Sequence, residues 1–142
     1  MNYKTFFKFG SWVLIATAGI HMLSFIGSPQ PANETERQLI DLMRNYKQDL
    51  GFGMLRSTQD IFNFLSLCMP FLCLFAGISN LLAVKHFDNE MLAKKIVTFN
   101  AVFWTVLLVP LYMLTFLPPE VCFTVAWLGF AAAFFAFKRR TP

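Results

Sequence analysis

Four long runs without a charged residue constrain the fold of this chain more than any other feature of its sequence. They cover Phe9–Ile26, Ile61–Val84, Ile96–Leu117 and Val121–Phe137, which are 18, 24, 22 and 17 residues long. A helix needs about 20 residues to cross a hydrocarbon core of about 30 Å, with a range of about 17 to 25. We therefore predict an integral membrane protein that crosses the bilayer four times.

The spans are predicted to be helices and not strands. Backbone N–H and C=O groups inside lipid need partners within the protein, which leaves helices and closed barrels. Barrel strands would alternate polar and apolar residues over about 10 positions, and these runs do not alternate. The predicted fold is all-α: one membrane domain, residues 1–142, built as an antiparallel four-transmembrane-helix bundle with spans at about 6–26, 58–84, 96–117 and 120–137.

The first run contains Ala16-Thr17-Ala18 before Gly19, a pattern that resembles a signal-peptide cleavage site. The apolar stretch continues through Ile26, however, so we expect the run to be kept as a transmembrane helix.

Basic residues flank the apolar runs and do not form a stripe of the kind that binds nucleic acid. Eight of the 12 lie on the side that both termini share with the connection 85–95: Lys4, Lys8, Lys85, Lys94, Lys95, Lys138, Arg139 and Arg140. The other four lie in the first connection: Arg37, Arg44, Lys47 and Arg56. Because basic residues concentrate in cytoplasmic segments, we predict that both termini are cytoplasmic.

The three cysteines, Cys68, Cys73 and Cys122, form no recognisable chemical motif. Their number and spacing match neither a disulfide framework, nor a C-x-x-C redox pair, nor a zinc site. We expect them to behave as small apolar side chains.

The connection between the first two runs is the one long polar segment of the sequence. Asn33 is typical of a helix N-cap, and Glu36 suits the reciprocal capping bond. Apolar residues then recur at helical spacing: Leu39, Leu42, Met43, Tyr46 and Leu50. We predict a short extracytoplasmic amphipathic helix at about 34–48, ended by Gly51 and Gly53. Its apolar stripe would lie in the membrane interface or cover the mouth of the bundle.

Prolines and small residues indicate further local features. Pro70 and Pro110 each remove a helical hydrogen bond, so a kink is expected near each. The segment Pro118-Pro119-Glu120 is predicted to be a tight turn on the outer side. Gly129 and Ala133 lie one turn apart and indicate a helix-packing face. Its partner is either a helix of the same chain or another copy in a homo-oligomer or larger membrane complex.

Polar side chains near the outer ends of the spans form the one candidate site. They are His21, Arg56, Asp60, Asn63, Tyr112 and Glu120. Polar and ionisable groups within a membrane are costly, which makes each of them a hypothesis of function. We expect His21 and Asp60 to approach one another, since a carboxylate is the partner that best offsets the burial of an imidazole.

Each of these residues also has a purely structural explanation. Asp60 would complete a capping box with Ser57, and Arg56 would extend toward lipid headgroups. Glu120 would cap the fourth span, and His21 would donate a hydrogen bond to a carbonyl or to Asp60. A small-molecule pocket and a catalytic site are the functional alternatives.

Several short motifs resemble those of a known group of proteins. They are Gly19 and His21 in the first span, Met43 in the polar helix, Arg56-Ser57-x-x-Asp60-x-x-x-Phe64 at the second span and Phe116-x-Pro118-Pro119 before the fourth. In these the chain resembles a group of small bacterial four-helix membrane proteins, similar in layout to the DoxX-like group. The resemblance implies a bacterial inner-membrane bundle and no particular reaction. DoxX-like proteins are associated with quinone and thiol-redox systems, but this chain lacks their paired redox cysteines.

The predicted function is non-enzymatic. The chain would be an accessory subunit, or a binder of a lipid-like or quinone-like molecule at its outer mouth, in contact with the lipid bilayer. The alternative is a membrane enzyme acting on a lipophilic substrate, with His21 as acid or base and Asp60 orienting it. A transporter is disfavoured because the apolar runs hold no charged residue at mid-bilayer. One histidine and two carboxylates fall short of a metal-ligand set, so no metal site is predicted.

Overall fold

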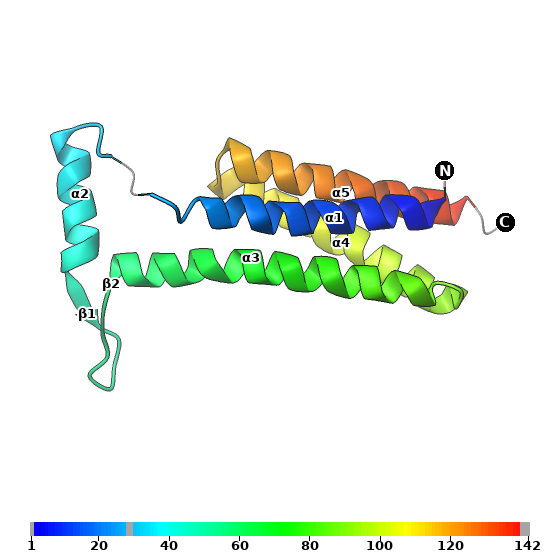
Figure 1. Ribbon diagram of the computed structural model, residues 1–142, viewed down its shortest axis with the longest axis horizontal. Helices are drawn as coiled ribbons and strands as arrows, with labels where there is room; N and C mark the ends of the chain where they lie inside the picture. Colours follow the sequence, from blue (N-terminus) through cyan, green and yellow to red (C-terminus); the bar gives the residue numbers. More distant parts are fainter. Residues whose placement is uncertain (1, 28–29, 140–142) are drawn as a thin grey trace.

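The computed structural model describes residues 2–27 and 30–139, and within them four long helices form the body of the protein (Figure 1). They are α1 (Tyr3–Leu23), α3 (Thr58–Ala83), α4 (Glu90–Leu114) and α5 (Leu117–Lys138). A single 3₁₀ turn, η1 (Val84–His86), follows α3 directly. Each long helix is apolar enough to cross a membrane, which confirms the predicted all-α bundle of four spans.

The observed helices include polar residues that flank the charge-free runs. Asn2 caps α1 by accepting the N–H of Lys4, and Asn89 caps α4 by accepting the N–H of Leu92. A side-chain oxygen at such a position satisfies an N–H that has no partner within the helix. The first and third spans therefore start earlier than predicted, at Tyr3 and Glu90.

The tight turn predicted at Pro118-Pro119-Glu120 is wrong, because these residues form the first turn of α5. Phe116 is the N-cap, and both prolines occupy positions whose N–H would have no helical partner to lose. The connection between α4 and α5 is therefore only Thr115–Phe116.

The packing order of the helices differs from their order in the chain. α1 packs against both α3 and α5, and α5 packs in turn against α4. α3 and α4 are consecutive in sequence but make almost no close backbone contact. The spatial order is therefore α3, α1, α5, α4.

Glycines allow α1 to approach both of its neighbours closely. A Cβ atom added to Gly129 of α5 would lie 2.8 Å from the Cα and N atoms of Gly10. One added to Gly77 of α3 would lie 2.8 Å from the carbonyl oxygen of Ser11. The predicted packing face with Gly129 and Ala133 is buried against α1, so it is filled within a single chain.

The exterior of the long helices is covered with large apolar side chains. Examples that are at least half exposed are Ile20, Phe71, Phe75, Phe99 and Val106. A surface of this kind on four spanning helices is one that lipid covers.

The end of the bundle at which α1 begins and α5 ends is here called the termini end (Figure 1). Aromatic side chains pack together there. Tyr3 packs edge-on against Phe137 with ring centroids 4.9 Å apart, and its hydroxyl donates to the Phe87 carbonyl. Phe7 packs against Phe87 at 5.1 Å. An ion pair of 2.9 Å between Lys4 and Asp88 lies beside them. α1 is thus fastened to the loop between η1 and α4.

A short helix and a hairpin form the opposite end, here called the α2 end. α2 (Glu34–Asn45) lies across this end of the bundle, next to the start of α3 (Figure 1). Strands β1 (Lys47–Asp49) and β2 (Leu55–Ser57) follow it and pair antiparallel, with Lys47 opposite Ser57. The amphipathic helix was predicted to reach residue 48, but it ends three residues earlier because the chain extends at Tyr46 to enter this hairpin.

Candidate functional site

A cavity of about 530 Å³ lies at the α2 end, between α1, α2 and α3. The residues that line it are Ser24, Phe25 and Gly27 after α1, Ile40 and Arg44 on α2, and Gln59, Asp60, Asn63 and Ser66 on α3. Pockets for small molecules generally measure about 300–1,000 Å³ and combine apolar walls with a few polar groups. The volume of this cavity lies in that range, whereas its lining is mainly polar, with Phe25 and Ile40 as the large apolar side chains.

The start of α3 fixes Asp60 at the edge of the cavity. The Ser57 hydroxyl accepts the N–H of Asp60 at 3.1 Å, and the Asp60 carboxylate accepts the N–H of Ser57 at 3.0 Å. These reciprocal bonds are the capping box that the sequence predicted. The Asp60 carboxylate thus satisfies the start of its own helix.

His21 joins α1 to α3 through a carbonyl that a proline has released. Its Nε2 lies 3.1 Å from the Ser66 carbonyl oxygen. Pro70, four residues later, has no N–H, so this carbonyl lacks its normal helical donor. A carbonyl only accepts, so Nε2 carries the proton in this contact. Of the two partners predicted for His21, the structure contains the carbonyl.

The predicted pairing of His21 with Asp60 is not formed. Each side chain is hydrogen-bonded to a different group, and no bond joins the two within the described residues. The physical reason is that each side chain has an unpaired backbone group nearby. Pro70 supplies an unpaired acceptor for His21, and the first turn of α3 supplies an unpaired N–H for Asp60.

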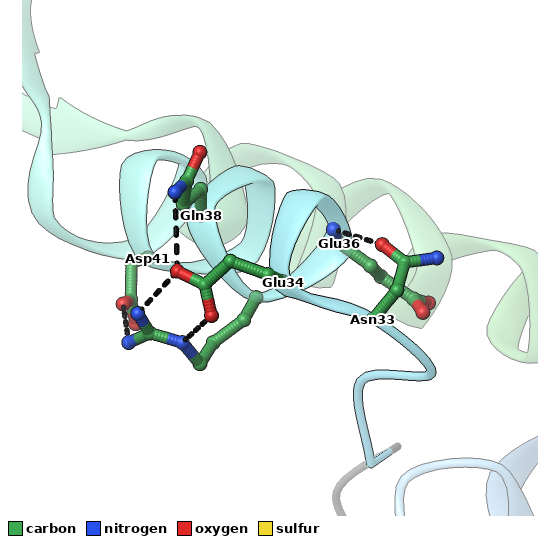
Figure 2. A network of polar contacts seen from close by, with 6 residues as sticks. Asn33, Glu34, Glu36, Gln38 and Asp41 are labelled. Atoms are coloured by element: carbon green, nitrogen blue, oxygen red, sulfur yellow. Dashed lines mark hydrogen bonds and ion pairs between the residues drawn. The ribbon is translucent and has the colours of Figure 1, made fainter.

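A network of polar contacts on α2 joins residues that do not line the cavity. Figure 2 shows Glu34 beside Gln38 and Asp41, and Arg37 bonds the Glu34 carboxylate at 2.6 Å and Asp41 at 3.5 Å. The hydrogen bond from Arg37 is the main cause that lowers the pKa of Glu34. Because these groups pair among themselves, none of them enters the cavity lining.

The N-terminus of α2 is capped nearly as predicted. The Asn33 side chain accepts the N–H of Glu36 at 2.9 Å (Figure 2). The Glu36 carboxylate accepts the N–H of Ala32 at 2.6 Å. The reciprocal bond therefore reaches one residue further back than the N-cap itself.

The predicted apolar stripe of α2 does not cover the cavity. Leu39, Leu42 and Tyr46 are 55, 62 and 60% exposed. The neighbouring face, with Ile40 and Arg44, is the one that closes the cavity. α2 borders the cavity through Ile40 and Arg44, but its apolar stripe is left exposed.

Of the four other predicted site residues, one lines the cavity and three do not. Asn63 lines the cavity and accepts a hydrogen bond of 2.8 Å from the Gln59 amide. Arg56 lies on β2 and donates to the Leu55 carbonyl. The Tyr112 hydroxyl contacts Thr124 at 2.5 Å and so joins α4 to α5, and Glu120 is half-buried in the first turn of α5. The latter three do not line the cavity.

Two buried asparagines form a polar pair that sequence reasoning missed. The Asn80 amide donates to the Asn100 side-chain oxygen at 2.8 Å, and Asn100 donates back at 3.2 Å. This pair joins α3 to α4. Its signal was present in the sequence, because an uncharged amide within an apolar run also requires a partner.

No protein-family model, no curated protein and no solved structure matches the chain. The resemblance to DoxX-like proteins gains no support from these comparisons. The fold defines a small multi-span α-helical membrane protein.

Proposed function

We propose that this membrane protein binds one amphiphilic molecule, lipid-like or quinone-like, in the cavity at its α2 end. It would act as a small binding protein or as the accessory subunit of a larger membrane complex. The observation that carries the proposal is the cavity of about 530 Å³ between α1, α2 and α3. Phe25 and Ile40 give it an apolar wall, and Asp60 and Asn63 give it a polar one.

Binding has more support than catalysis. An acid–base pair would need His21 and Asp60 within reach of the same reacting group. His21 is instead bonded to the Ser66 carbonyl, and Asp60 to the backbone of Ser57. His21 thus joins α1 to α3 beside the cavity, and Asp60 caps the start of α3, so both side chains are engaged in structural contacts.

The cavity is proposed to face the extracytoplasmic side of a bacterial inner membrane. Eight of the 12 basic residues lie in the two terminal segments of the sequence and in residues 85–95, and basic residues concentrate on the cytoplasmic side. Single cysteines at Asn45→Cys and Glu90→Cys, in a chain whose native cysteines are replaced by alanine, would test this. An impermeant thiol reagent should label the first and spare the second in intact cells. The reverse pattern would overturn the orientation.

Native mass spectrometry of the detergent-extracted protein tests the binding itself. We expect one molecule of lipid or quinone to remain bound per chain. Asn63→Trp should remove it by filling the cavity, whereas Gln38→Trp, on the polar face of α2, should retain it. A chain without a bound molecule, or one whose bound molecule survives Asn63→Trp, would contradict the proposal.

A further inference from the structure

Arg44 differs from the other arginines of the α2 end in having no partner. Arg37 pairs with Glu34 and Asp41, and Arg56 donates to a backbone carbonyl. Arg44 lines the cavity and forms no hydrogen bond or ion pair with residues 2–27 and 30–139. A guanidinium presents five donors in a fixed planar fork, which suits the oxygens of a phosphate or carboxylate group.

The carboxylate that shares the cavity does not neutralise Arg44. Asp60 accepts the Ser57 N–H, and no ion pair joins it to Arg44 in the part of the chain that the structure describes. Asn63 accepts a hydrogen bond from Gln59 through its oxygen, which leaves its amide N–H₂ group available as a donor. The cavity therefore offers hydrogen-bond donors together with a positive charge, and this combination favours an anion over a neutral quinone ring.

The face of α3 that continues from the cavity is apolar and hollowed. A second space of about 310 Å³ is lined only by Phe64, Leu67, Cys68, Phe71 and Leu72. Phe64, Leu67 and Phe71 follow Asp60 by four, seven and eleven residues, so these three share its side of the helix. Leu72 follows Asp60 by 12 positions, a rise of about 18 Å at about 1.5 Å per residue. That length is close to half of a hydrocarbon core of about 30 Å.

We infer that the bound amphiphile is a phospholipid, whose phosphate is held by Arg44 and whose acyl chain lies along the α3 groove from Phe64 to Leu72. The inference rests on the proposed function and names the ligand class for that site. The apolar groove favours a phosphate that belongs to a lipid, because a free phosphate ion has no acyl chain that could occupy the groove. The exposed stripe of α2 lies at the membrane interface, where a lipid phosphate also lies.

Titration with matched lipids in detergent, followed by native mass spectrometry, tests this assignment. Dioleoyl phosphatidylglycerol and dioleoylglycerol have the same acyl chains, and only the first carries a phosphate. We expect the phospholipid to bind more tightly. Arg44→Gln should weaken it by about 10- to 100-fold, as expected for a lost charge-assisted hydrogen bond. Arg37→Gln removes the same charge from a residue of α2 that pairs with Glu34 and Asp41 and does not line the cavity, so it should leave the affinity unchanged.

The possible outcomes separate this inference from the proposed function. Equal binding of both lipids, unaffected by Arg44→Gln but abolished by Asn63→Trp, would overturn the phosphate assignment and leave an amphiphile site in place. Competition by inorganic phosphate at the affinity of the lipid would overturn the role of the α3 groove. Binding that neither Arg44→Gln nor Asn63→Trp alters would overturn the inference and the proposed function together.

Discussion

At the termini end Tyr3 is almost fully buried against Phe87 and Phe137, whereas at the α2 end no residue of α2 is buried. The first region is held by aromatic packing, and the second by caps and surface ion pairs. Packing of buried rings contributes more to stability than exposed pairs do. The comparison indicates that the termini end maintains the fold, while the α2 end can adapt to a bound molecule.

The largest effect should come from the crossing of α1 and α5. Gly129→Val would place side-chain atoms against the backbone of Gly10, and overpacking of a fitted interface costs about 1–3 kcal/mol. We expect a marked fall in the thermal unfolding temperature in detergent. Gly19→Ala is the control, since a Cβ there has no atom within 4 Å. An unchanged transition for Gly129→Val would show that this crossing does not maintain the fold.

A smaller loss is expected for the amide pair that joins α3 to α4. Asn80→Leu leaves Asn100 with an unsatisfied group in a buried site, and hydrogen bonds between membrane helices are worth about 0.6 kcal/mol on average, up to about 1.7. The double variant with Asn100→Leu should lose less than the sum of the single variants. Strictly additive losses in thermal unfolding would mean that the two amides act independently.

The next effect concerns the link between His21 and Pro70. His21→Ala should destabilise the protein by about 0.6 kcal/mol. In a Pro70→Ala background the same change should cost less, because the restored N–H of residue 70 bonds to the Ser66 carbonyl. His21→Ala and Asp60→Ala, by contrast, should be additive, since they share no partner. Coupling between His21 and Asp60, together with additive effects of His21 and Pro70, would contradict this assignment of hydrogen-bond partners.

The smallest effect is a pH dependence at the termini end. The hydrogen bond and charge of Lys4 lower the pKa of Asp88. The pair therefore favours the folded state above the ordinary carboxyl pKa of about 3.9, and this contribution is lost as the pH falls through the lowered value. Asp88→Asn should slightly lower the unfolding temperature at neutral pH and low salt. The difference should vanish in acid and in about 1 M salt; a difference that persists in salt would exclude the ion pair as its cause.

The sequence predicted the four spans, because the length and apolar character of a membrane helix are local properties. The caps at Asn33 and Ser57 were predictable for the same reason, since their partners lie three residues away. The hairpin after α2 was missed because the apolar residues that suggested a longer helix also suit an extended segment. Gly51, Phe52 and Gly53, which have positive φ values of 99, 55 and 73°, form the turn that this hairpin needs.

The candidate site was only partly predictable, because its residues come from three elements. Depth in the membrane correctly placed Asp60 and Asn63 at one end of the bundle, but it also grouped Tyr112 with them. Depth carries no information on which helices are neighbours, and Tyr112 belongs to the pair α4–α5. Arg44 was not among the predicted site residues, because the rotation of α2 about its axis is set by contacts with α3 and not by its own sequence pattern.

The order in which the helices pack has a consequence for how the chain assembles during synthesis. α1 and α3 emerge first and can pair through Gly77 at once, since each is the other's neighbour. α4 then enters lipid with the Asn80–Asn100 pair as its main link to what precedes it. Among the four long helices, α5 is the one that packs against both α1 and α4. Until α5 is inserted, α4 is joined to α1 and α3 mainly by the asparagine pair and by the η1 turn, so α5 is the span that completes the packing of the bundle.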